Sequence, residues 1–310
     1  MINENSAPEA IRIGLIGYGE VGKIFAQALL ERGAAWVGTY DVLLKDAAKA
    51  PTMRAQAEQA GVAAVDSATA LLDRADAVIS AVTASQTLAV ATEAAAAIRP
   101  GTWFLDVNSA SPGTKAAAGR AIDGAGGRYV ESAMMTSVPP YGIGVPMLLG
   151  GAHAQAAASL FAPLGFSMVV ASEEIGVASA IKMCRSVFIK GLEAIVIESY
   201  AAARQYGVED RVLASLAETF PTIDWEKQGA YLFSRVAQHG RRRAEEMREA
   251  SVTVKEAGFD PHMAAASAAR QDMIARLAAQ GAFTGLDATA DWRAYADRIL
   301  ALVRPDQARG

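Results

Sequence analysis

The feature that most constrains this chain is a glycine-rich turn near its N-terminus. Residues 17–22 read G-Y-G-E-V-G, with an apolar run before them and a helical pattern after them. In such a strand–turn–helix unit, the first glycine permits the tight turn, the second lets the backbone approach a pyrophosphate, and the third lets the helix pack on the strand. The N–H groups at the start of the helix favour phosphate. The residues predicted to bind a dinucleotide are Gly17, Tyr18, Gly19, Glu20, Val21 and Gly22.

An acidic residue at the end of the next predicted strand extends this motif. Asp41 lies about 20 residues beyond Gly22, where an acidic side chain accepts hydrogen bonds from the adenosine ribose hydroxyls. A carboxylate at this point would repel the 2′-phosphate of NADP, whereas the nearby Lys45 offers a cation that could reach a phosphate. The pattern therefore favours NAD over NADP as the cofactor.

The two halves of the chain have different hydrophobic patterns. Up to about residue 171, apolar runs alternate with helical patterns, which is typical of a parallel sheet covered on both faces. Residues 176–205 form one long helical pattern, and nearly everything beyond is helical, with breaks near Gly207, Pro221 and Gly258. We predict an α/β fold, with a Rossmann-type parallel-sheet domain at 1–174 and an all-helical domain at 175–310 that begins with a long interdomain helix. The expected strands are 11–17, 35–40, 77–82, 102–107, 128–132, 145–149 and 166–170, and the expected helices of the first half are 21–32, 46–60, 85–98, 112–124 and one beginning near 153.

Composition narrows the range of functions. Hydrophobic residues make up 52% of the 310 residues and charged residues 20%, which is typical of a globular protein. The net charge of -4 argues against nucleic-acid binding. The single cysteine, Cys184, is expected to be a small buried side chain. Without a signal-peptide pattern or a membrane-spanning run, we expect a soluble cytoplasmic protein with no membrane partner. His153 and His262 show no partnering pattern, so no metal site is expected.

Two further segments follow a recognisable pattern. Residues 106–112 read D-V-N-S-A-S-P, similar to a D-x-S-T-x-x-P segment, and residues 176–182 read G-V-A-S-A-I-K, similar to G-x-G-x-x-x-K with Ala178 replacing the second glycine. Together with the glycine-rich turn, they resemble the β-hydroxyacid dehydrogenase superfamily, which includes 3-hydroxyisobutyrate and 6-phosphogluconate dehydrogenases. The resemblance extends over most of the first 200 residues and implies a nicotinamide-dependent dehydrogenase.

The resemblance also implies roles for individual residues. Lys182 would be the catalytic lysine, and Ser109 would hold the substrate near the nicotinamide. The family's asparagine four residues after the lysine is replaced by Ser186, its D-A-P-V-S-G-G loop is replaced by E-S-A-M-M-T-S-V-P-P at 131–140, and its K-D-L near the C-terminal end is not recognisable. Residues 239–247, H-G-R-R-R-A-E-E-M, look instead like a divergent branch whose C-terminal domain has no known function. The family's substrate therefore does not transfer to this chain.

The long helix that begins near Gly176 carries a narrow polar stripe. At 100° per residue, Lys182, Ser186, Lys190 and Glu193 lie within roughly 80° of one another, and most of the remaining circumference is apolar. Such a stripe is expected on a helix that lines a cleft, and equally on one that faces solvent. In a cleft, Lys182 would move the hydroxyl proton that accompanies hydride transfer. Ser186 would bind substrate, with helix packing as the alternative, and Lys190 with Glu193 is expected to form a helical ion pair.

A second polar cluster lies farther along the chain. On a helical interpretation of residues 230–250, His239, Arg242, Arg243 and Glu246 share one face. Because arginine binds carboxylate or phosphate bidentately, Arg242 and Arg243 are predicted to contact an anionic substrate group, with His239 beside them. The alternative is a solvated surface turn whose charge is balanced by neighbouring glutamates.

The sequence thus predicts an oxidoreductase that transfers a hydride between NAD, or less favourably NADP, and a β-hydroxyacid or related alcohol. Two alternatives stay open, a phosphogluconate-like oxidative decarboxylase and a non-catalytic NAD-sensing protein. Imine reduction is disfavoured because Lys182 occupies a position where imine reductases often have another residue. A long helix with apolar residues around most of its circumference needs cover on several sides, which together with the resemblance favours a homodimer.

Overall fold

The computed structural model of the protein describes residues 11–303. The chain divides into two compact units, residues 1–183 and 184–310. The division falls inside α7 (Val177–Tyr206), the long helix that the sequence predicts at 176–205. The first turns of α7 therefore belong to the first unit, and the remainder of the helix belongs to the second.

The first unit is built on an eight-stranded sheet with the strand order β3-β2-β1-β4-β5-β6-β7-β8. Neighbouring strands are parallel except β6 and β7, which are antiparallel. All seven predicted strands are present, and β3 escaped prediction because it is only two residues long. The strands are β1 (Arg12–Ile16), β2 (Trp36–Tyr40), β3 (Ala63–Ala64), β4 (Ala77–Ser80), β5 (Trp103–Asp106), β6 (Arg128–Met134), β7 (Pro146–Gly150) and β8 (Ser167–Ser172).

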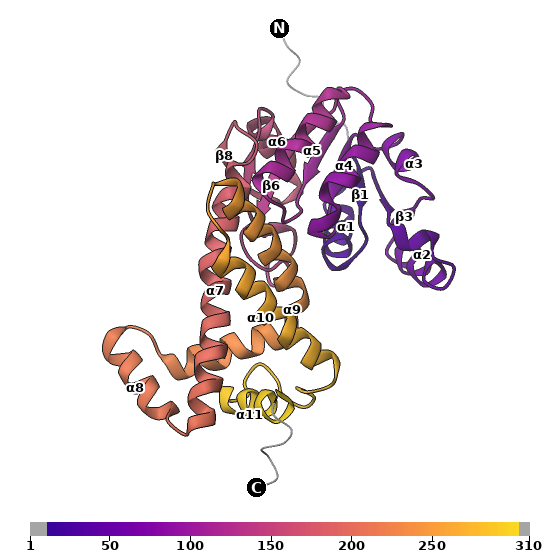
Figure 1. Cartoon of the computed structure of the whole chain (residues 1–310). Coiled ribbons are helices and arrows are strands. Elements are labelled where there is room, and N and C mark those ends of the chain that lie inside the picture. Colours follow the sequence, from indigo (N-terminus) through magenta and orange to yellow (C-terminus); the bar gives the residue numbers. More distant parts are fainter. Residues whose placement is uncertain (1–10, 304–310) are drawn as a thin grey trace. The chain divides into compact units, whose positions relative to one another are not determined.

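Helices cover both faces of this sheet (Figure 1). Phe25 of α1 and Phe161 of α6 pack on one face, in a cluster that includes Leu15 of β1. Leu71 of α3 and Ala91 of α4 belong to the cluster on the other face. The predicted α/β class with a mostly parallel, Rossmann-type sheet is confirmed. The helices of this unit are α1 (Glu20–Glu31), α2 (Ala50–Gln59), α3 (Ala68–Leu72), α4 (Thr87–Ala95), α5 (Pro112–Gly124) and α6 (Ala154–Phe161).

The helix predicted at 46–60 begins later than expected. Residues Val42–Lys45 form a 3-10 turn, and α2 starts only at Ala50. Pro51 lies in the first turn of α2, where its missing N–H costs no helical hydrogen bond. The proline therefore fits the start of this helix and not its interior.

Up to residue 303, the second unit contains helices and no strands, as predicted. After α7 it contains α8 (Glu209–Thr219), α9 (Trp225–Glu256), α10 (His262–Ala279) and α11 (Trp292–Val303). Gly207 and Gly258 interrupt the helices with positive φ values of 66° and 87°. The helices α9 and α10 lie side by side (Figure 1). The core of the unit is aromatic, and the ring centroids of Tyr200 and Trp292 lie 4.8 Å apart. Among the described residues, none of the helices is both long enough and apolar enough to span a membrane.

Candidate functional site

The glycine-rich turn connects β1 to α1 in the first unit. Gly17 has a φ of 100°, and a Cβ placed there would lie 2.3 Å from the carbonyl oxygen of Ala81. A Cβ on Gly22 would lie 2.1 Å from the carbonyl oxygen of Gly17. These two positions accept only glycine, since the backbone leaves no room for a side chain. The fold itself therefore requires the first and third glycines of the motif.

Gly19 is different, because no packing in the described residues explains it. A Cβ placed on Gly19 would have no described atom within 4 Å. Gly19 is also the N-cap of α1, and within the described chain no side chain caps that helix start. An open glycine beside uncapped N–H groups leaves the space and the donors that a pyrophosphate needs. The turn thus fits a dinucleotide.

The other predicted residues of the turn differ in exposure. The ring of Tyr18 is buried, which raises the pKa of its hydroxyl, and the Lys23 nitrogen lies 5.7 Å from the ring centroid. Glu20 is exposed in the first turn of α1, and Val21 packs partly against the core. A contact of Glu20 or Val21 with a cofactor would therefore rest on the backbone N–H group more than on the side chain, whereas the backbone N–H of Tyr18 is bonded to Asp41.

Asp41 ties the end of β2 to the glycine-rich turn. Its Oδ2 accepts a hydrogen bond from the backbone N–H of Tyr18 at 2.8 Å, and its Oδ1 accepts one from Leu43 at 2.9 Å. A carboxylate has about four acceptor positions, so two bonds leave capacity for ribose hydroxyls. The Lys45 nitrogen lies 5.4 Å from the centroid of the Tyr40 ring, and a hydrogen bond with Tyr40 raises the pKa of Lys45. Asp41 is thus the charged group tied directly to the turn.

The segment after β5 is fixed by a buried amide. The Oδ1 of Asn108 accepts a hydrogen bond from the backbone N–H of Val82 at 2.7 Å, and its Nδ2 donates to Ser80 Oγ at 3.0 Å. Asn108 therefore joins the carboxyl ends of β4 and β5, the edge of a parallel sheet at which ligands bind. The next residue, Ser109, is only partly buried.

Lys182 and Ser109, which the resemblance places at one reaction centre, are in contact. The Lys182 Nζ donates a hydrogen bond to Ser109 Oγ, although the two residues come from α7 and from the segment after β5. Both residues belong to the first unit. An amine beside a hydroxyl, at the same sheet edge as the glycine-rich turn, can exchange a proton with an alcohol bound there.

The sequence does not reveal what holds the start of α7. Glu131 on β6 is fully buried, and its carboxylate accepts hydrogen bonds from the backbone N–H groups of Gly176 and Ser179, both at 2.6 Å. The signal available in the sequence was an acidic residue inside a predicted strand.

A second buried network also escaped prediction. Lys115 Nζ lies 2.9 Å from both Asp106 Oδ1 and the Asp106 carbonyl oxygen, and the Tyr129 hydroxyl donates to Asp106 Oδ2 at 2.7 Å. Burial, followed by the charge of Asp106, raises the pKa of Tyr129 well above its usual value. Lys115 is fully buried, and a lone lysine in a helix gave no sign of this.

In the second unit, the polar stripe of α7 is packed inside. Ser186, Lys190 and Glu193 are all buried. Lys190 Nζ lies 2.8 Å from Glu246 Oε2 on α9 and donates to Ser186 Oγ at 3.1 Å. Glu193 accepts hydrogen bonds from Arg243 on α9. The predicted ion pair between Lys190 and Glu193 is therefore wrong, because each residue pairs with the facing helix.

The predicted arginine cluster separates into an inner and an outer half. Arg243 is buried, and its Nε donates to Glu193 Oε2 at 2.8 Å. Arg242 is exposed, with its Nε 3.8 Å from Glu246 Oε1. His239 is partly buried on the same helix. Of the two arginines, only Arg242 presents an exposed guanidinium to an incoming anion.

Some apolar side chains of α7 are exposed, although others, such as Ile197 and Tyr200, are buried in the core. Phe188 is 72% exposed and Ile195 is 52% exposed. Cys184 is exposed as well, so the prediction of a buried cysteine is wrong. The periodicity identified the polar stripe of α7 and left open whether it lines a cleft or faces solvent, and in the structure Lys190 and Glu193 of this stripe pair with α9.

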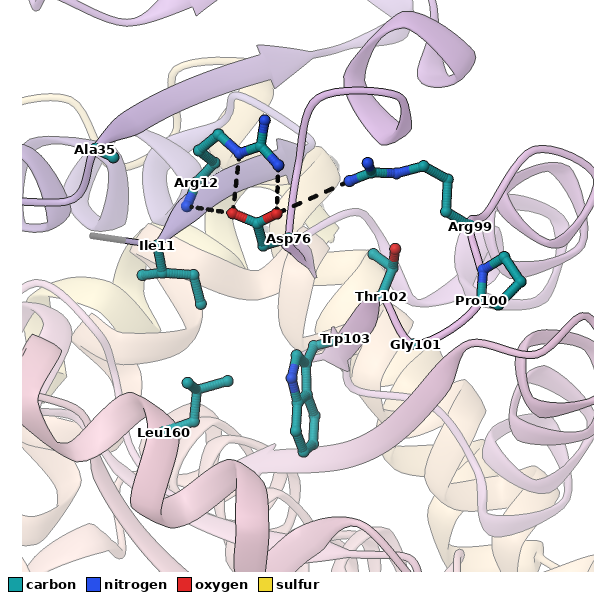
Figure 2. A pocket seen from close by; sticks show the side chains of 10 residues that line it. All are labelled: Ile11, Arg12, Ala35, Asp76, Arg99, Pro100, Gly101, Thr102, Trp103 and Leu160. Carbon is teal, nitrogen blue, oxygen red and sulfur yellow. Dashed lines mark hydrogen bonds and ion pairs between the residues drawn. The ribbon is translucent and has the colours of Figure 1, made fainter. Parts of the chain in front are cut away.

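In the first unit, a cavity of about 890 Å³ lies at the edge of the sheet where the parallel strands begin, opposite the edge that carries the glycine-rich turn (Figure 2). It is lined by Arg12 at the start of β1 and by Trp103 at the start of β5. Arg12 binds the Asp76 carboxylate through Nε at 3.0 Å and through a terminal nitrogen at 2.6 Å, and this contact holds the pKa of Asp76 below its usual value. The cavity therefore lies away from the glycine-rich turn, and the charges of Arg12 and Asp76 in its lining are paired with each other.

Two segments of the chain, one in each unit, match known families. Residues 12–109 match the family described as NADP oxidoreductase coenzyme F420-dependent, and residues 203–274 match a domain of unknown function, DUF1932. An uncharacterised 28.5 kDa protein of Methanothermus fervidus is 29% identical over 242 residues, which cover 77% of this chain and 89% of that protein.

Solved structures extend the similarity to nearly the whole length. A conserved hypothetical protein from Sinorhizobium meliloti 1021 is 37% identical with a TM-score of 0.76, and the alignment covers 94% of this chain and 96% of that one. The conserved protein MTH1747, described as structurally similar to 3-hydroxyacid dehydrogenases, is 31% identical with a TM-score of 0.68 over 87% and 99% of the two chains.

The same fold occurs in a more distant enzyme. A Mycobacterium tuberculosis 3-hydroxyisobutyrate dehydrogenase is 19% identical with a TM-score of 0.67, covering 93% of this chain and 98% of that one. The matched domains, the extent of the closer similarities and the fold lead to one conclusion. The chain belongs to the 3-hydroxyacid dehydrogenase-like proteins of the β-hydroxyacid dehydrogenase superfamily, in the branch that carries the DUF1932 helical domain.

Proposed function

We propose that the protein is an NAD-dependent oxidoreductase that acts on a β-hydroxyacid or a related alcohol. The observation that carries this proposal is the hydrogen bond between Lys182 and Ser109, in the same unit as the glycine-rich turn and Asp41. Bound NAD would supply the hydride acceptor. The family membership and the NADP oxidoreductase match of residues 12–109 support the reaction class.

The proposed chemistry assigns the proton to Lys182. In the oxidation direction, the uncharged amine of Lys182 would take the proton of the substrate hydroxyl while a hydride leaves the carbon that bears this hydroxyl for the cofactor. In reduction, the Lys182 ammonium would return the proton. The Ser109 hydroxyl, now bonded to the amine, marks where the substrate oxygen would sit and would help to hold it.

The proposed preference for NAD rests on Asp41. Its carboxylate is fixed to the turn through Tyr18 N–H and retains acceptor capacity for two ribose hydroxyls, whereas a 2′-phosphate would meet its negative charge. Lys45, the cation considered as a phosphate partner, bonds with Tyr40. The expected order of affinity is therefore NAD before NADP.

The substrate is proposed to be anionic. Arg242 has the exposed guanidinium needed for a carboxylate or phosphate, and Ser186 and His239 complete the set proposed to contact the substrate. Arg243 was predicted to contact the substrate with them. Because its guanidinium is bonded to Glu193, we propose that Arg243 does not contact the substrate and instead holds α9 against α7.

A homodimer is proposed because apolar side chains of α7 are exposed. Phe188 and Ile195 expose most of their surface, and a second copy of the chain would cover them. We place the protein in the cytoplasm, as its sequence predicts. Sedimentation equilibrium of the purified chain tests the dimer, and a monomer at micromolar concentration would contradict it.

The reaction is tested by mixing the protein with NAD or NADP and a panel of β-hydroxyacids and related alcohols, while the absorbance of the reduced cofactor is followed. Turnover of a hydroxyacid with NAD is the expected result. Release of carbon dioxide together with the reduced cofactor would identify an oxidative decarboxylase. Tight NAD binding by calorimetry with no turnover across the panel would overturn the proposal in favour of an NAD-sensing protein.

A further inference from the structure

Two buried carboxylates lie next to each other on the central strands of the first unit. Asp106 is the last residue of β5, and its partner in the register with β6 is Glu131. Their exposed fractions are 1% and 0%. Burying one carboxylate is costly, and burying two neighbouring ones is more so, unless each has its own compensating partners.

The partners of Asp106 lead toward Ser109. Lys115 pairs with the Asp106 carboxylate. The Oδ1 of Asp106 also accepts a hydrogen bond from the backbone N–H of Asn108 at 3.0 Å. Asn108 in turn bridges to β4 through Val82 and Ser80. The residue before Ser109 is therefore held on two sides, so the Ser109 backbone has little freedom to move.

The partners of Glu131 lead toward Lys182. The two backbone N–H groups that it accepts belong to Gly176, just before α7, and to Ser179, in the first turn of the helix. That first turn reads V-A-S-A and contains no acidic residue of its own. The negative charge that stabilises the N-terminus of α7 is thus supplied from another element, 45 positions earlier in the chain.

The surrounding backbone is shaped to this carboxylate. A Cβ on Gly150 of β7 would lie 2.5 Å from Glu131 Oε2, so only glycine leaves room for the carboxylate at that point. Gly176 has a φ of 106°, which turns its N–H into the same site. The position of the first turn of α7 relative to β6 is therefore set by Glu131.

We infer that Glu131 is a positioning residue for Lys182. The carboxylate fixes the first turn of α7 on β6, while Asp106 and Asn108 fix the Ser109 segment on the neighbouring strand, so that the amine and the hydroxyl meet. The chemical meaning of the meeting point rests on the proposed function, but the positioning itself is a property of the fold.

The test measures the chemical accessibility of the Lys182 amine without any need for a substrate. Wild type and Glu131→Gln are treated with trace acetic anhydride across a range of pH, and the acetylation of each lysine is quantified by peptide mass spectrometry. Lys49, whose side chain is 62% exposed, is the internal standard, and the fully buried Lys115 reports general loosening of the unit. Glu173→Gln removes the same charge from an exposed site nearby and is the matched control.

Glutamine can accept only through its single oxygen, so one of the two bonds to backbone N–H groups is lost and the other is no longer charge-assisted. We expect acetylation of Lys182 relative to Lys49 to rise about tenfold in Glu131→Gln, with Lys115 still protected and Glu173→Gln like wild type. Unchanged acetylation of Lys182 would overturn the inference, and so would a parallel rise at Lys115, because that means loosening of the whole unit.

A second variant keeps the test decisive if glutamine prevents folding. Glu131→Asp retains the charge but sets the carboxylate back by one carbon, and it should give a smaller rise at Lys182 than Glu131→Gln. In an active enzyme, Glu131→Gln should lower kcat about tenfold while the Kd for NAD changes less than about twofold. Because acetylation does not depend on turnover, a protein with no dehydrogenase activity would refute the proposed function and leave the positioning result to stand or fall separately.

Discussion

The side-chain nitrogen of Lys182 donates a hydrogen bond to the hydroxyl of Ser109, which lies 73 positions earlier in the chain. The lysine comes from the first turns of α7, and the serine follows Asn108 at the carboxyl end of β5. The two side chains meet only when the sheet has formed and α7 has begun against it. This contact brings an amine and a hydroxyl together at the edge of the sheet where the glycine-rich turn also lies.

Replacing Lys182 should remove the proton transfer and leave cofactor binding intact. In Lys182→Ala we expect kcat on an identified hydroxyacid to fall by about 10²-fold or more, since general acid–base catalysis contributes that much. The Kd for NAD, measured by calorimetry, should stay close to that of wild type, because the glycine-rich turn and Asp41 are untouched. Lys49→Ala, at an exposed position, is the control. Full turnover by Lys182→Ala would show that another group moves the proton.

Replacing Asp41 should alter the choice of cofactor. Asp41→Ala removes the acceptor proposed for the ribose hydroxyls and the charge proposed to oppose a 2′-phosphate, so NAD affinity should fall by about tenfold or more while NADP affinity falls less or rises. The ratio of the two Kd values is the informative quantity, because loss of the bond to Tyr18 N–H weakens both cofactors alike. Asp66→Asn, which changes an exposed carboxylate, should leave that ratio unchanged.

The features that the sequence predicted are those whose cause is local. The glycine-rich turn depends on the spacing of Gly17, Gly19 and Gly22, and the breaks between the helices depend on Gly207 and Gly258, which adopt positive φ. Alternating apolar runs were sufficient to predict seven strands and the α/β class. A resemblance to a known family, and not periodicity, identified Lys182 and Ser109 as a pair.

The features that the sequence missed depend on partners far away in the chain. In the sequence, Glu131 is an unexplained acidic residue within a buried strand. Its partners, the backbone N–H groups of Gly176 and Ser179, lie more than 40 positions later in the chain. The polar stripe of α7 was visible, but periodicity does not tell which side of a helix faces protein. Glu193 is buried because Arg243 of α9 supplies the opposite charge, and no local pattern in the sequence reveals that pairing.

The two neighbouring arginines of α9 should behave differently when each is removed. Arg243→Ala leaves the buried Glu193 without its main partner and should lower the free energy of unfolding of the helical unit by about 3–5 kcal/mol. Arg242→Ala removes an exposed pair with Glu246 and should change it by less than about 1 kcal/mol. Urea unfolding followed by tryptophan fluorescence, with helix content by circular dichroism, measures both. Equal losses would contradict the division into inner and outer residues.

The same pair of variants tests the proposed anion contact. If Arg242 binds the substrate, Arg242→Ala should raise KM for an anionic hydroxyacid several-fold in a protein of unchanged stability, and Arg242→Lys should restore only part of the affinity, because lysine lacks the bidentate fork. An unchanged KM in Arg242→Ala would mean that the cluster is an ordinary solvated surface.

Stability at alkaline pH should depend on Tyr129. Burial, with the charge of Asp106, raises the folded-state pKa of Tyr129 well above 10.0, whereas in the unfolded chain it titrates near its ordinary value. Because this pKa is raised on folding, the contribution of Tyr129 to the free energy of unfolding is fully present below about pH 10. It is lost as the pH rises toward the folded-state pKa, because only the unfolded chain then releases the Tyr129 proton. Tyr129→Phe loses the bond to Asp106 and should be less stable than wild type by about 1–3 kcal/mol at pH 7.

That difference should shrink between about pH 9 and pH 11, since phenylalanine has no proton to lose. Unfolding by urea at a series of pH values, with hydrogen exchange of β5 and β6 to follow the first unit alone, measures the difference directly. Tyr141→Phe, at an exposed tyrosine, is the control and should give a difference near zero at every pH. A gap between wild type and Tyr129→Phe that stays constant up to pH 11 would mean that Tyr129 ionises as readily in the folded unit as in the unfolded chain, and that the Asp106 site is open to water.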